Sequence, residues 1–164
     1  MNSVGSHPFL GRSVIGPIDL LSEEGIEIPL PKTLLSRWSM NLLKNEGAKG
    51  AVSIIFCSDR YIRDLNHKFR NKNCTTDVLS FPWTEEGSLL EQDSVLGELY
   101  ISTAQVERQA PRFGTTFEEE MQRVVIHGLL HLCGYNHISS ADRLKMRKKE
   151  KEYLSRDPYC ELSP

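Results

Sequence analysis

Apolar residues recur along the chain with two different periods, and the periods distinguish strands from helices. Short runs rich in β-branched and aromatic residues at 51–57, 78–81 and 96–102 predict strands. The segment 13–28 mixes β-branched residues with glycine and proline, which predicts an edge strand or two short strands around a turn. The pattern therefore predicts about four strands.

Apolar residues spaced three and four apart predict about five helices between and after these strands. The first follows Pro31 and stops at Gly47, and the others begin at residues suited to capping a helix N-terminus. These caps are Ser58, Ser102 with Gln105, Thr116 with Glu119, and Ser139 with Asp142. The expected fold is an α/β (α+β) single domain, in which about five helices cover a small mixed sheet of about four strands.

The helix that begins after Thr116 should be the central one because it carries the most continuous apolar stripe. The stripe consists of Phe117, Met121, Val124, Val125, Leu129 and Leu132. At about 100° per residue, His127 and His131 fall on the border of this stripe. We therefore expect both histidines where the wall of a cleft meets the core.

Length and charge set limits on the class of protein. The 164 residues suffice for one domain with a core, and we expect residues 1–11 to be disordered and residues 12–164 to form the domain. No apolar run reaches the roughly 18 residues of a membrane span and no signal-peptide pattern is present, so we expect a cytoplasmic protein without a membrane partner. The net charge of −2 gives no overall attraction to nucleic acid, so such binding requires a local basic patch.

The strongest chemical signal is the spacing of three histidines. His127 and His131 are four residues apart, so on a helix their imidazoles can converge on one ion. Gly134 can turn the chain back after the helix and return His137 to the same ion. Isolated histidines are usually structural, but this spacing predicts one bound divalent metal ion, Zn²⁺, with His127, His131 and His137 as ligands. Cys133 points away on the helix wheel and is expected to be a small buried hydrophobe.

Three neutral imidazoles leave one tetrahedral position of zinc open, which is typical of a catalytic ion and favours hydrolysis. The spacing also matches zinc peptidases of the metzincin type, in which glutamate follows the first histidine and acts as general base. Here that position is Gly128, and Glu120 lies two helical turns away, roughly 10 Å along the axis. A peptidase is therefore retained only as an alternative.

Several segments together resemble a known family. Gly128 between the first two histidines, the segment from Leu132 to His137, the run Thr-Asp-Val-Leu-Ser-Phe-Pro at 76–82, and Leu-Gly-Glu at 96–98 are similar to marked segments of the YbeY family of metal-dependent endoribonucleases. The resemblance covers residues from 51 to the end of the chain. It implies that the three histidines bind zinc and that the functional arginine of the family corresponds to Arg70. Asn136 stands where the family usually has aspartate.

The resemblance implies a zinc-dependent, single-strand-directed endoribonuclease that acts in ribosomal RNA processing, including 16S rRNA 3′ end maturation, and in ribosome assembly and quality control. In this hypothesis Arg70 is catalytic and stabilises negative charge that develops on a phosphodiester. The expected partners are single-stranded ribosomal RNA and the ribosome or small-subunit proteins, but not DNA. The alternatives are a non-catalytic ribosome-assembly factor with a structural zinc ion, and the metzincin-like peptidase.

The last predicted helix carries six basic residues within less than three turns. They are Arg143, Lys145, Arg147, Lys148, Lys149 and Lys151. Such a run is either a solvated helix face or a contact surface for RNA, and phosphate contacts would make binding fall steeply with salt.

Overall fold

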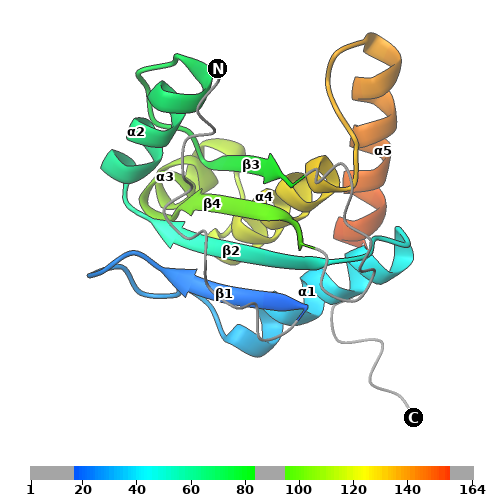
Figure 1. Cartoon of the computed structure of the whole chain (residues 1–164), viewed down its shortest axis with the longest axis horizontal. Coiled ribbons are helices and arrows are strands. Elements are labelled where there is room, and N and C mark those ends of the chain that lie inside the picture. Colours follow the sequence, from blue (N-terminus) through cyan, green and yellow to red (C-terminus); the bar gives the residue numbers. More distant parts are fainter. Residues whose placement is uncertain (1–16, 84–94, 156–164) are drawn as a thin grey trace, which may run out of the picture.

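The fold is a mixed four-stranded sheet with helices on both faces, as seen in a computed structural model that describes residues 17–83 and 95–155 (Figure 1). The strands are β1 (Ile18–Ser22), β2 (Ala51–Cys57), β3 (Val78–Pro82) and β4 (Val95–Ser102). Their order is β1-β2-β4-β3, with β1, β2 and β4 parallel and β3 antiparallel to β4. The predicted mixed sheet and the edge position of the first strand are confirmed.

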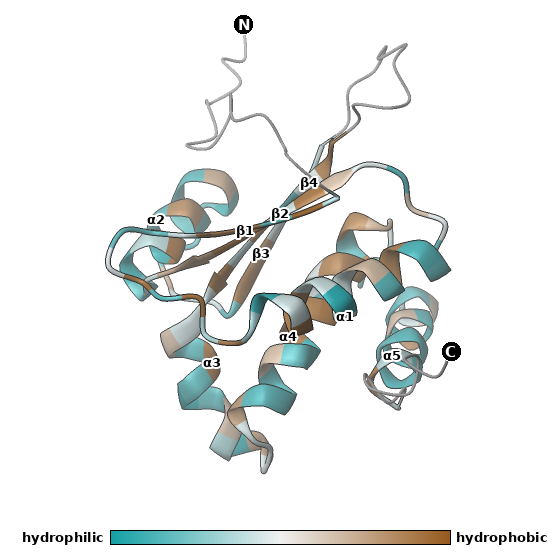
Figure 2. Ribbon diagram, turned by 90° about the horizontal axis from the view of Figure 1, so that it is seen from below, coloured by the Kyte–Doolittle hydropathy of each residue, from teal (hydrophilic) through white to brown (hydrophobic). Residues whose placement is uncertain are grey.

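Two helices cover one face of the sheet and one helix covers the other (Figure 2). The helices are α1 (Lys32–Asn45), α2 (Asp59–Arg70), α3 (Thr103–Gln109), α4 (Phe117–Leu132) and α5 (Ser140–Ser155). Because side chains alternate along a strand, Ile54 and Phe56 of β2 pack in the core with α1 and α4, whereas Ile55 packs with Ile62 and Leu65 of α2. The fold class predicted from the hydrophobic pattern is therefore confirmed.

Helix α4 lies in the main core, as its apolar stripe predicted. Met121, Val124, Val125 and Leu129 are fully buried. The predicted stripe was too narrow, because Ile126 and Leu130 are buried as well. Helix α4 contacts α1 and α5 as well as the sheet. These helices bury residues of α4 that do not face the sheet.

The predicted helix caps are present, with one difference. Thr116 and Glu119 form a reciprocal capping box at the start of α4. Ser102 accepts a hydrogen bond from the Gln105 backbone, but the Gln105 side chain contacts Gln109 instead of returning to Ser102. Helix α3 ends at Gln109 and continues as a 3-10 turn, Ala110–Phe113.

One prediction, the disordered segment 1–11, falls on residues outside the described ranges. Within the ranges that are described, no helix has the length and apolar character needed to cross a membrane.

Candidate metal centre

The end of α4 is shaped to bring a third histidine back to the helix. Gly134 has a φ of 95°, a conformation that glycine adopts readily. The backbone N–H of Gly134 donates to the His131 carbonyl and that of Tyr135 to the Leu130 carbonyl, which together form a Schellman motif. The turn predicted at Gly134 is therefore present, and it carries the chain toward His137.

The three predicted histidines form a compact cluster. The Nε2 atoms of His131 and His127 are 3.1 Å apart, and those of His137 and His127 are 3.4 Å apart. A tetrahedral zinc ion with Zn–N bonds of about 2.0–2.1 Å requires ligand nitrogens about 3.3 Å apart. The cluster can therefore hold one divalent metal ion, with its candidate ligand atoms all within 4.8 Å of one another.

Hydrogen bonds on the far side of two imidazole rings leave the Nε2 lone pairs available. His131 Nδ1 lies 2.9 Å from the Tyr135 carbonyl oxygen, which only accepts, so Nδ1 carries the proton. His127 Nδ1 contacts the carboxylate of Glu150. With the proton on Nδ1, the Nε2 lone pair of each ring faces the other histidines, and unprotonated nitrogens this close favour a cation between them.

The surroundings of the cluster favour neutral histidines. Burial, followed by the charge of His127, lowers the pKa of His131 to about 4. Burial and the charge of His127 also lower the pKa of His137. Because a metal ligand must be an unprotonated imidazole, both rings are available as ligands at neutral pH.

Glu150 was not identified from the sequence, although it contacts a candidate ligand directly. It comes from α5, 23 residues after His127. Burial opposes its ionisation, but the hydrogen bond from His127 and the charge of His127 hold the pKa of Glu150 below the usual value of 4.5. A carboxylate that accepts from the outer nitrogen of a ligating histidine fixes the orientation of the ring and increases its basicity. In the sequence it is the one acidic residue within the basic run, between Lys149 and Lys151.

A second glutamate holds the chain that connects α4 to α5. The carboxylate of Glu46, just after α1, accepts hydrogen bonds from Tyr135 at 2.7 Å, Tyr153 at 2.6 Å and Lys149 at 3.0 Å. Burial alone would raise the pKa of Glu46, but these bonds hold it below 4.5. Since the Tyr135 carbonyl accepts from His131, Glu46 stabilises the segment that orients this histidine.

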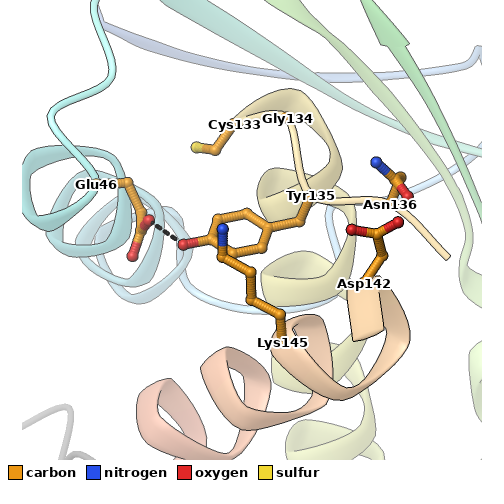
Figure 3. A pocket seen from close by; sticks show the side chains of 7 residues that line it. All are labelled: Glu46, Cys133, Gly134, Tyr135, Asn136, Asp142 and Lys145. Carbon is orange, nitrogen blue, oxygen red and sulfur yellow. Dashed lines mark hydrogen bonds between the residues drawn. The ribbon is translucent and has the colours of Figure 1, made fainter. Parts of the chain in front are cut away.

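Beside Tyr135 lies a hollow of about 210 Å³ (Figure 3). Its lining residues are Glu46, Cys133, Gly134, Tyr135, Asn136, Asp142 and Lys145, and none of the three histidines is among them. Burial raises the pKa of the Cys133 thiol to about 11, so this residue remains a neutral thiol at neutral pH. Cys133 is half-buried, not buried as expected, and the candidate ligand group does not include it.

Arg70 is the last residue of α2. The helix extends this far because Asn71 takes the left-handed conformation and its N–H bonds to the His67 carbonyl. The side chain of Arg70 is exposed, and its positive charge is among the lesser causes that lower the pKa of His131. The positive charge of Arg70 therefore acts on His131, one of the candidate metal ligands.

The segment after Arg70 supports α4 from the side. Asp77 and the buried Glu120 both accept hydrogen bonds from the Gln109 amide and from Arg123. Glu120 is only 1% exposed and forms an ion pair with Arg123 at 2.7 Å, so its carboxylate serves the scaffold. These bonds connect the residue before β3, the end of α3 and the part of α4 that lies one to two turns before His127.

Gly128 faces the sheet, and its close packing explains the absence of a side chain. A Cβ atom at this position would lie 3.0 Å from a methyl group of Leu99 and 3.2 Å from one of Val78. The Gly128 carbonyl also accepts a hydrogen bond from Ser80. The glutamate of a metzincin-type peptidase would fit here only if Leu99 and Val78 shifted, which argues against that alternative.

Asn136 has a local structural role. Its Oδ1 accepts a hydrogen bond from the backbone N–H of Ile138 at 3.0 Å. An aspartate at this position would accept the same hydrogen bond from the Ile138 N–H and would add a negative charge beside His137.

Comparisons with known proteins relate the chain to one family. Residues 22–157 match the profile of the family described as Endoribonuclease YbeY. Proteins named Endoribonuclease YbeY from Flavobacterium psychrophilum and Pelotomaculum thermopropionicum are 39% and 40% identical to the chain, in each case over 75% of this chain and 84% of the relative. The solution structure of TM1509 from Thermotoga maritima is 35% identical with a TM-score of 0.58, covering 84% of this chain and 86% of that one.

Proposed function

The chain belongs to the YbeY family of endoribonucleases, and from this membership we propose that it is a zinc-dependent endoribonuclease that cleaves single-stranded regions of ribosomal RNA. The observation that carries the proposal is the convergence of three imidazole Nε2 atoms at a spacing suited to one zinc ion. The more specific expectations are 16S rRNA 3′ end maturation and participation in ribosome assembly and quality control, in the cytoplasm.

Each residue of the centre has a separate role in this proposal. His127, His131 and His137 would hold the ion, which when bound acts as a Lewis acid toward a phosphate oxygen and lowers the pKa of water to about 7. Glu150 and the Tyr135 carbonyl fix the rings of His127 and His131. The guanidinium of Arg70 stabilises the negative charge that develops on the phosphate.

The test is cleavage of a defined, unstructured RNA oligonucleotide by zinc-loaded protein. Arg70→Glu should lower the cleavage rate at least about 100-fold, the effect of losing one preorganised electrostatic contact, while the zinc content stays unchanged. The matched control is Arg63→Glu, a charge reversal at another exposed position of α2, which should retain cleavage. Equal rates for Arg70→Glu and the wild type would remove Arg70 from the mechanism.

A second variant separates the enzyme from the non-catalytic assembly factor. His131→Ala removes a candidate metal ligand and should abolish cleavage. If the wild type and His131→Ala cleave the RNA equally, the activity comes from a contaminating nuclease and the assembly-factor alternative is favoured.

A further inference from the structure

The basic run of α5 divides according to the face of the helix. Arg143, Arg147 and Glu150 are spaced by four and three residues, so at 3.6 residues per turn they lie within a sector of about 60°. The Glu150 carboxylate contacts His127, which directs this sector toward the histidine cluster. Arg143 and Arg147 therefore lie on the face of α5 that borders the candidate metal centre.

Other basic residues of the run lie elsewhere. Lys145 and Lys148 are exposed and project roughly 140–200° around the helix from Arg143. Lys149 donates a hydrogen bond to Glu46 and is part of the structural contact between α5 and α1. The six basic residues thus do not form one uniform surface.

The two arginines are available for a ligand. Both are exposed, and Arg143 has one long hydrogen bond of 3.4 Å to the Ser140 hydroxyl. Among the residues with described positions, neither arginine forms an ion pair within 4.0 Å.

Arg70 approaches the centre from a different element. Arg70 is the last residue of α2, and Figure 1 shows α2 (green) and α5 (orange to red) at opposite ends of β3. The histidine cluster therefore has cationic side chains on two sides.

We propose that Arg143 and Arg147 bind the phosphate backbone of single-stranded RNA on the α5 side of the candidate metal centre. This inference rests on the proposed endoribonuclease function. The strand would run from Arg70 across the histidines to α5, which would place a phosphodiester at the metal centre. Arginine suits this task because its planar guanidinium binds phosphate oxygens through paired hydrogen bonds. A local site is required because the chain has a net charge of −2.

The experiment measures how salt weakens binding of a fluorescein-labelled 12-nucleotide oligouridylate to the zinc-loaded protein, by fluorescence anisotropy with a gel check that the RNA is intact. Each phosphate contact to a single strand contributes about 0.7 to the slope of log K against log salt concentration. The double variant Arg143→Ala/Arg147→Ala should therefore lower the slope by about 1.4. Its matched control, Lys145→Ala/Lys148→Ala, removes the same charge from the opposite face of the helix and should keep the wild-type slope.

Arg143→Lys/Arg147→Lys retains both charges and should recover most of the wild-type slope, which would exclude misfolding as the cause of a loss. Equal slopes for the arginine and lysine double-alanine variants would overturn the proposal even if the wild type cleaves RNA. A wild-type protein that neither binds nor cleaves the oligonucleotide would overturn both this inference and the proposed function.

Discussion

Replacing Glu150 by glutamine tests whether α5 supports the candidate metal centre. The substitution keeps the size of the side chain but removes the negative charge that faces His127 Nδ1. The Glu150 side chain is 18% exposed, so water screens the interaction little. Hydrogen bonds to charged groups contribute about 1.5–3 kcal/mol and neutral ones about 0.5–1.5 kcal/mol. The midpoints of these ranges differ by about 1.2 kcal/mol, roughly an eightfold change in affinity, which is close to the lower end of the 10–100-fold loss of metal affinity typical of such outer partners.

The assay is zinc affinity measured by competition with a chromophoric chelator. Glu150→Gln should raise the dissociation constant roughly 10–100-fold. Glu118→Gln makes the same chemical change at an exposed position in the first turn of α4 and should remain within about twofold of the wild type. Thermal unfolding of the metal-free proteins verifies that both variants fold. A zinc affinity of Glu150→Gln within twofold of the wild type would refute the role assigned to this carboxylate.

Two further predictions concern the scaffold around the centre. Glu46→Gln weakens three hydrogen bonds and should lower the free energy of unfolding by about 1–2 kcal/mol in urea at pH 7. The pKa of Glu46 is held below 4.5 in the folded protein, so its contribution to the free energy of unfolding is present above pH 4.5 and is lost in stronger acid. The stability difference between Glu46→Gln and the wild type should therefore shrink as the pH falls below 4.5. A stability difference that grows in acid would contradict this role of Glu46. Gly128→Glu places a charged side chain against Leu99 and Val78 and should cost more than about 3 kcal/mol in the same urea assay. A stable Gly128→Glu protein that cleaves casein would instead revive the peptidase alternative.

The sequence predicted those features that local geometry determines. The spacing of His127 and His131 is fixed by the helical repeat, and Gly134 marks the turn after the helix. Thr116 with Glu119 could be identified as a capping box because both partners lie within one turn. The strand pattern identified β2 with its observed bounds, since a strand packed between helices on both faces is almost continuously apolar.

Contacts between distant segments could not be predicted in the same way. Glu150 reaches His127 only because α5 packs against α4 in one orientation, and periodicity does not specify that orientation. Glu46 contacts Tyr153 across 107 residues for the same reason. The sequence showed that Gly128 replaces the glutamate of a metzincin-type peptidase. The close approach of Leu99, which explains the glycine, depends on how α4 lies on the sheet and could not be predicted.

The most direct test of the central claim is zinc binding to the purified full-length protein by isothermal titration, together with the same measurement on His137→Ala. The geometry of the three imidazoles predicts one zinc ion per chain for the wild type and a loss of at least about 100-fold in affinity for the variant, because one of three ligands is missing. If the wild type binds no zinc, or if His137→Ala binds it with unchanged affinity and stoichiometry, the three histidines are not a zinc site.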